Sequence, residues 1–144
     1  MKREYYAMTL SKLAYLGKKD IIKNLPEDFE FITFFSFDEI QGFICECDEG
    51  QVVAFRGSEA KLNDWKANFD INLIRTDLGN VQEGYYNALS DCEMLIRVFL
   101  HDNGVLVTGH SFGGGLSILF SKMLDKRHGY NSKCIAFEPP RVTD

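Results

Sequence analysis

The pentapeptide Gly109-His110-Ser111-Phe112-Gly113 fits the Gly-x-Ser-x-Gly pattern, in which a serine hydroxyl acts as a nucleophile. Three fixed positions carry little weight alone, because ordinary Gly and Ser frequencies produce them by chance in about 5% of chains this long. The setting adds weight, since the apolar run 105–108 predicts a strand and the pattern over 111–127 predicts a helix. A sharp turn between them would present the Ser111 hydroxyl, and the flanking glycines would let strand and helix approach closely. The alternative is a glycine-rich turn with an ordinary N-cap serine.

A second segment can supply the electrostatic half of such a site. Residues 52–58 form an expected strand that runs into Gly57 and the hydroxyl residue Ser58. A glycine turn there can deliver a backbone N–H and a hydroxyl to a developing oxyanion. The N-terminus of the helix expected from Ser111 onward adds further N–H groups and the positive end of a dipole. The two segments indicate acyl-transfer chemistry that implies no metal and no organic cofactor.

The elements that must position these residues alternate between helix and strand in the second half of the chain. That order predicts a right-handed crossover onto a parallel sheet, whereas the strand-rich first half predicts an antiparallel arrangement with a hairpin turn at Asp48-Glu49-Gly50. The fold class is therefore α/β with three layers, in a single domain over 1–144. The expected helices are 5–16, ended by Gly17, a short piece broken by Pro26, 81–102, closed by Asn103-Gly104, and 111–127; the expected strands are 29–37, 42–47, 51–55, 105–108 and 133–137, with a short apolar piece at 71–74.

Composition and charge exclude several classes of protein. With 144 residues and 45% hydrophobic content the chain can bury one core, which excludes disorder. The formal charge of −5 argues against a nucleic-acid partner. No signal peptide and no membrane-spanning run is visible. The cysteines are spaced as small buried hydrophobes rather than as disulfides or zinc ligands, which favours a reducing, cytoplasmic compartment; they are Cys45, Cys47, Cys92 and Cys134.

The order of several short motifs resembles the class 3 (fungal-type) lipases of the α/β-hydrolase fold. The resemblance runs over nearly the whole chain, and the combination is far more specific than any one motif. It implies a three-layer mixed sheet flanked by helices, from which this chain would lack the C-terminal strands. The landmarks are Gln41-Gly42-Phe43, Ala54-Phe55-Arg56-Gly57-Ser58, Asp64-Trp65 with Asn68, Gly84-Tyr85, 107–114 and Pro140-Arg141-Val142. The chain departs from the family at Gln82, where His is usual, and at Thr143, where Gly is usual.

The resemblance implies roles for residues at matching positions. Ser111 would be the nucleophile within the elbow that also contains Gly109, His110 and Gly113, and the oxyanion hole would consist of Ser58 and the Phe112 N–H. The segment 59–70 would correspond to the lid or the region beside it. Its apolar residues would then meet lipid or an acyl chain, although ordinary core packing is the alternative; they are Leu62, Trp65 and Phe69.

The base that a nucleophilic serine needs is not evident in the sequence. Such a base must lie within about 3 Å of the serine, and an acid must orient it; the resembled fold supplies both later in the chain. His128 would lie roughly 25 Å from Ser111, at the far end of a helix that rises about 1.5 Å per residue. His101 would sit at the opposite end of the preceding strand, and the His110 side chain would point away. Asp144 is a weak candidate for the acid, so the triad acid and histidine stay unassigned.

Three explanations account for this deficit. The first is a fragment whose acid and histidine lie beyond position 144 or on another chain. The second is a short lipase-like protein that binds lipid or protein without turnover, and the third is a subunit that takes its base from a neighbour. The expected strand 133–137 would also lie at a sheet edge, and such edges recruit partners. We therefore expect a homo-oligomer or a strand-complementing partner. The functional hypothesis is a serine hydrolase of lipid esters, with possible contact to a membrane or lipid surface; the alternative is a non-catalytic binding module.

Overall fold

The computed structural model describes residues 2–57, 73–101 and 103–143. Within them a mixed sheet has the strand order β1-β2-β3-β6-β7, and a separate two-stranded sheet consists of β4 and β5. The strands are β1 (Glu30–Phe37), β2 (Ile40–Cys47), β3 (Gly50–Phe55), β4 (Leu73–Thr76), β5 (Gly79–Gln82), β6 (Leu106–His110) and β7 (Lys133–Phe137). The helices are α1 (Lys2–Tyr5), α2 (Ala7–Leu13), α3 (Lys18–Asn24), α5 (Glu83–Arg97) and α6 (Phe112–His128).

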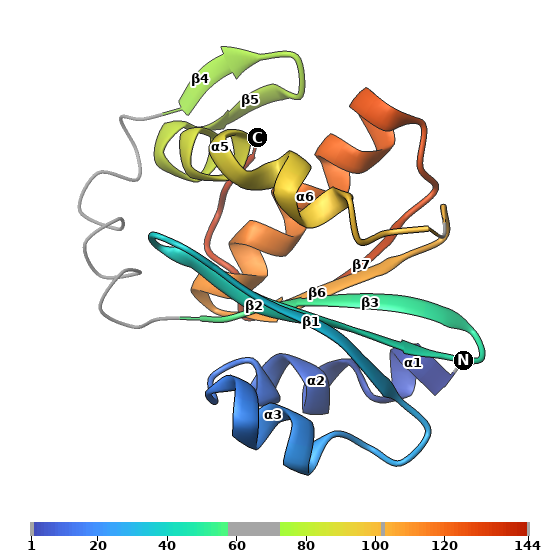
Figure 1. Cartoon of the computed structure of the whole chain (residues 1–144). Helices are drawn as coiled ribbons and strands as arrows, with labels where there is room; N and C mark the ends of the chain where they lie inside the picture. Colours follow the sequence, from blue (N-terminus) through green and yellow to red (C-terminus); the bar gives the residue numbers. More distant parts are fainter. Residues whose placement is uncertain (1, 58–72, 102, 144) are drawn as a thin grey trace.

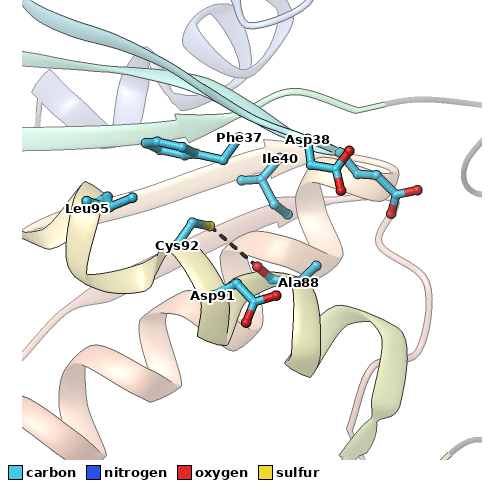
Figure 2. Close-up of a pocket in the computed structure, with 8 residues that line it drawn as sticks. Phe37, Asp38, Ile40, Ala88, Asp91, Cys92 and Leu95 are labelled. Atoms are coloured by element: carbon cyan, nitrogen blue, oxygen red, sulfur yellow. Dashed lines mark hydrogen bonds between the residues drawn. The ribbon is translucent and has the colours of Figure 1, made fainter.

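The helices cover the two faces of the large sheet, which gives the expected three layers (Figure 1). The N-terminal helices α1, α2 and α3 lie on one face, and α5 and α6 lie on the other. A cavity lies on the α5–α6 side of the sheet, between the β1–β2 turn and α5 (Figure 2). No helix within the described segments is long and apolar enough to cross a membrane.

The strand pairing agrees with the sequence-based expectation. β1, β2 and β3 form an antiparallel meander whose second hairpin closes between Cys47 and Gly50. β3 and β6 are parallel, as are β6 and β7, and α6 makes the crossover between the last two strands. Because parallel strands end at the same edge of a sheet, the residues that follow β3, β6 and β7 come together there.

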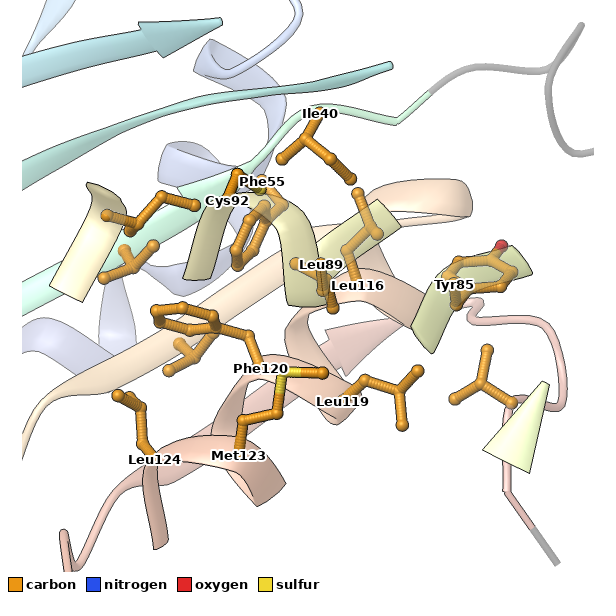
Figure 3. Close-up of a cluster of buried hydrophobic side chains, with 14 of the residues drawn as sticks. Ile40, Phe55, Tyr85, Leu89, Cys92, Leu116, Leu119, Phe120, Met123 and Leu124 are labelled. Atoms are coloured by element: carbon orange, nitrogen blue, oxygen red, sulfur yellow. The ribbon is translucent and has the colours of Figure 1, made fainter. Parts of the chain in front are cut away.

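Alternation along β6 divides its side chains between two hydrophobic cores. Leu106 belongs to the core beneath α1–α3, and Val107 belongs to the core beneath α5 and α6. Figure 3 shows the second core, in which Phe55 and Phe120 from different elements pack edge to face with their ring centroids 5.3 Å apart. Each such buried aromatic ring contributes about 1.5–3 kcal/mol of transfer free energy. These two cores hold the ends of β3 and β6 in place.

The prediction of one N-terminal helix over 5–16 is wrong in its bounds. Two helices occur instead, divided at Tyr6, whose ring packs edge-on against Phe29 with 5.5 Å between centroids. Gly17 does not end the second helix. It adopts an extended conformation and precedes α3, where its carbonyl accepts the hydrogen bond from the Ile21 N–H.

The long helix expected over 81–102 is also shorter in the structure. Its first residues instead form β5, which pairs with β4, so the helix starts only after Gln82. At the other end, the buried Gln51 side chain donates to the Phe99 carbonyl and accepts from the His101 N–H, both at 2.9 Å. These bonds satisfy the backbone outside a helix, which explains why α5 ends before Asn103-Gly104.

Three of the four cysteines are buried as expected, and all four are free thiols. Cys45 and Cys47 lie in the core beneath α1–α3, and burial raises the pKa of the Cys92 thiol on α5 to about 11. Cys134 is exposed, contrary to the expectation, because it lies on β7 at the edge of the described sheet.

Candidate active site

Ser111 occupies the turn between β6 and α6, at the edge of the sheet where β3 also ends. Its backbone has φ 57° and ψ −120°, a region that costs a non-glycine residue about 1–3 kcal/mol. An ordinary N-cap serine is extended and bonds its hydroxyl to the first helical turn. Ser111 makes no side-chain capping hydrogen bond, so its geometry differs from the N-cap alternative.

The glycines on either side of Ser111 permit very close backbone packing. A Cβ atom at Gly109 would run into the carbonyl of Gly113, and one at Gly113 would run into the carbonyl of Phe55 and lie 2.8 Å from the Arg56 carbonyl carbon. The start of α6 is therefore pressed against the ends of both β6 and β3. A side chain at Gly113 would force the elbow and the β3 turn apart, and one at Gly109 would force the end of β6 away from the start of α6.

The turn after β3 is fixed by two hydrogen bonds to β2. The Arg56 N–H donates to the Gln41 carbonyl at 2.7 Å, and the Arg56 guanidinium donates to the Gln41 side-chain oxygen at 2.9 Å. Gly57 follows and is buried. These contacts fix Arg56 and Gly57, the two residues that precede Ser58 in the sequence, next to the elbow.

Several of the predicted site residues lie outside the described residues. They are the oxyanion-hole residue Ser58, the candidate triad acid Asp144, and the apolar residues of the expected lid region, which are Leu62, Trp65 and Phe69. Phe112 is described: it is the first residue of α6, is buried, and packs against the ring of Tyr85 with 5.1 Å between centroids.

The three histidines have partners other than Ser111. His101 bonds Glu46, and His128 at the far end of α6 bonds Glu93, each at 2.8 Å. His110 closes β6, and its Nδ1 lies 2.7 Å from the Tyr15 hydroxyl while its Nε2 lies 3.8 Å from the Glu138 carboxylate. No group of His, Cys, Asp and Glu side chains in 2–57, 73–101 and 103–143 has the geometry to hold a metal ion.

The sequence around the elbow and the β3 turn matches a known protein family. The sequence pattern of the family described as lipase (class 3) matches residues 52–144, which include both the β3 turn and the elbow. The chain belongs to the class 3 lipase family. A comparison with curated protein sequences gave no match.

Solved lipase structures share the fold of this class 3 lipase chain. The mono- and diacylglycerol lipase of Aspergillus oryzae superposes with a TM-score of 0.70 at 20% identity, over 96% of this chain and 62% of its own. Lipase II of Rhizopus niveus gives 0.68 at 20% identity, over 98% and 63%. The native Rhizomucor miehei lipase propeptide complex gives 0.67 at 20%, over 98% and 53%. These matches establish an α/β-hydrolase-type fold, and the chain spans between half and two thirds of the length of each structure.

The two positions at which this chain departs from the usual lipase landmarks are neighbours in the fold. Gln82 is 3% exposed, and its side-chain oxygen caps α5 by accepting from the Tyr85 N–H at 2.9 Å. Its own N–H donates to the Val142 carbonyl at 2.8 Å, and Val81 forms a β-bridge with Thr143. Gln82 therefore caps α5 and helps to hold the Pro-Arg-Val segment next to β5.

A polar cluster on the α5–α6 side was missed by sequence reasoning. Arg127 donates to both Asp77 carboxylate oxygens at 2.7 and 3.0 Å, to Glu93 at 3.0 Å and to the Tyr86 hydroxyl at 2.8 Å. The guanidinium lowers the pKa of Asp77 to about 2. No local pattern in the sequence indicates this cluster, because the partners of Arg127 lie 34 to 50 residues away. The cluster ties the β4–β5 turn to both helices.

The cavity beside the β1–β2 turn contains no predicted site residue. It has a volume of about 210 Å³, an apolar part that includes Phe37, Ile40 and Leu95, and carboxylates at its rim that include Asp38 and Asp91 (Figure 2). Ile40 lies on β2, and β3 lies between β2 and β6 in the sheet. The cavity therefore lies beside a different part of the sheet from the elbow. It is therefore distinct from the candidate site around Ser111.

Proposed function

We propose that this chain carries the nucleophile and oxyanion-hole half of a serine hydrolase that acts on carboxylic esters of lipids. Ser111 Oγ attacks the ester carbonyl, and the tetrahedral oxyanion is stabilised by the Phe112 N–H and by Ser58. The proton of the Ser111 hydroxyl passes through the base to the alkoxide, which leaves as the alcohol when its bond to the carbonyl carbon breaks. Water then attacks the acyl-serine ester, the bond to Ser111 Oγ breaks, and the carboxylic acid and the free Ser111 hydroxyl are formed. The positive end of α6 favours the negative charge of the intermediate.

The observation that carries this proposal is the backbone of Ser111. A positive φ at a non-glycine residue persists only where the surroundings impose it, and such strain clusters at functional sites. Gly109 and Gly113 make the strained turn compatible with close packing on β3. Membership of the class 3 lipase family supports the same role for the serine.

The experiment is a time course of covalent labelling with a fluorophosphonate probe. The natural sequence is compared with Ser111→Ala and with Ser90→Ala, which removes an exposed hydroxyl from α5. We expect labelling of the natural sequence and of Ser90→Ala and none of Ser111→Ala, and rapid labelling would support a working base beside Ser111. Labelling that persists in Ser111→Ala would contradict the assigned nucleophile.

A non-catalytic lipase-like module for lipid or protein is the second candidate. It is favoured by the histidine contacts, since His101 and His128 are engaged with Glu46 and Glu93 and His110 is engaged with Tyr15. A histidine that lies beyond position 144 or on another chain would be needed for turnover. A folded sample that binds the probe nowhere would favour the module.

The remaining features of the function are proposals of the same kind. Leu62, Trp65 and Phe69 provide an apolar contact for acyl chain or lipid surface, and no nucleic-acid partner is proposed for a chain of charge −5. A cytoplasmic location is supported by the free thiols. β7 pairs with a strand of a second copy or of another polypeptide, because the described structure leaves its outer edge open.

A further inference from the structure

Tyr15 and His110 form a hydrogen-bonded pair at the base of the elbow. Tyr15 follows α2 in the N-terminal helix layer, 95 residues before its partner. Its hydroxyl lies 2.7 Å from His110 Nδ1, and the ring centroids are 5.9 Å apart with planes inclined by 62°. The alternation of β6, in which Leu106 faces the same layer, places the His110 ring on the α1–α3 side of the sheet.

The same hydroxyl also contacts the turn after β3. It lies 3.5 Å from the His110 carbonyl oxygen, and a Cβ atom at Gly57 would run into both the Tyr15 hydroxyl and that carbonyl. One phenol group therefore touches the residue before Ser111 and the residue before Ser58. These are the two chain segments that must be held at a fixed separation if their donors are to bind one oxyanion.

We propose that Tyr15 and His110 are positioning residues that set the distance between the β3 turn and the serine elbow. This inference rests on the proposed function of Ser111. Oxyanion donors are effective only within about 2.7–3.1 Å of the developing charge, and a misplacement of about 1 Å can reduce a rate on the order of 100-fold. Tyr15 and His110 act through the backbone of Gly57 and Ser111 and touch no reacting atom.

The contacts explain why the hydroxyl matters more than the ring. The ring packs beneath the turn, and phenylalanine would preserve that packing. Only the hydroxyl reaches His110 Nδ1, so its loss frees the imidazole to rotate and relaxes the contact with Gly57. Glu138 lies 3.8 Å from His110 Nε2, but its side chain is 85% exposed and is a weak restraint.

The test measures the saturating rate and the half-saturating concentration of fluorophosphonate labelling for Tyr15→Phe, His110→Ala, the double variant and His110→Asn. Tyr5→Phe is the matched control, since Tyr5 is exposed on α1 in the same layer. We expect Tyr15→Phe and His110→Ala each to lower the saturating rate about 10-fold. The half-saturating concentration and the melting temperature of Tyr15→Phe should stay unchanged. The double variant should be no slower than the slower single variant, and His110→Asn should recover part of the rate.

The outcomes separate the positioning role from the proposed function. If Tyr15→Phe labels as fast as Tyr5→Phe, or if the two single effects multiply in the double variant, the positioning role is wrong while the nucleophile assignment stands. If the natural sequence is folded but unlabelled, the proposed function fails and the positioning role fails with it. A rate loss matched by a fall in melting temperature for Tyr15→Phe would also overturn the proposal, because it would indicate a structural role only.

Discussion

The N–H of Ser111 donates a 2.8 Å hydrogen bond to the carbonyl oxygen of Phe137, the last residue of β7. The strained conformation of the elbow is thus fixed by a neighbouring strand as well as by its own glycines. After Phe137 the chain turns at Glu138, which also has a positive φ of 48°. β7 therefore belongs to the support of the candidate site, and changes in its environment should reach Ser111.

Replacement of Gly113 by alanine should destabilise the fold. The added Cβ would meet the carbonyl of Phe55, and overpacking of this kind costs about 1–3 kcal/mol. Gly17→Ala is the control: no atom lies within 4 Å of the added Cβ and φ is −75°. The smaller entropy of the unfolded alanine chain opposes the preference for glycine at the N-cap of α3, so the free energy of unfolding should change little. Urea unfolding measures both, and equal stability of Gly113→Ala and the natural sequence would contradict the close approach.

The cap at the start of α5 gives a second prediction. Gln82→Ala removes the acceptor for the Tyr85 N–H and should lower the free energy of unfolding by about 1 kcal/mol. Gln82→Asn keeps a side-chain amide oxygen and should lose less. Chemical denaturation with both variants checks this, and an unchanged midpoint for Gln82→Ala would show that the cap contributes nothing.

The Arg127 cluster predicts how stability depends on pH. Arg127 lowers the pKa of Asp77 to about 2 in the fold, below its ordinary value of 3.8. A depressed pKa means that the stabilisation is present above the unfolded value and is lost as the pH falls from there toward 2. The natural sequence should therefore exceed Asp77→Asn in stability at pH 6, and the difference should shrink between pH 4 and pH 2. A difference that is constant with pH would contradict the ion pair.

The outer edge of β7 predicts self-association. The Lys133 N–H donates inward to the Val105 carbonyl, so the N–H groups of Cys134 and Ala136 point away from β6. Light scattering at high micromolar concentration should give a mass above that of one chain, and Ala136→Pro, which removes an outward donor, should restore the monomer. A monodisperse monomer of the natural sequence would refute self-association through this strand.

Much of the sheet was predictable because its signals are local. The bounds of the strand 133–137 agree with β7, and the Asp48-Glu49-Gly50 turn fixed the β2–β3 hairpin. The strand–helix junction at Ser111 was predictable because its glycines and apolar flanks lie within a few residues of one another. Such short-range patterns constrain the backbone before any tertiary contact forms.

The errors arose where distant residues override local patterns. Val81 fits a helical spacing, yet it pairs with Ile74 and bridges Thr143, which converts the start of the expected helix into β5. Gln51 ends α5 from a strand 48 residues earlier in the sequence. Tyr15 and His110 are likewise 95 residues apart, and the residues around each of them do not predict the contact.

The nucleophile assignment is tested most directly by locating the labelled atom. The natural sequence is treated with a fluorophosphonate and digested, and peptide-resolved mass spectrometry identifies the modified residue. We predict a single adduct on Ser111, which is lost in Ser111→Ala and retained in Ser90→Ala. An adduct on any other residue, or a folded chain without an adduct, would contradict the central claim that this elbow carries a working nucleophile.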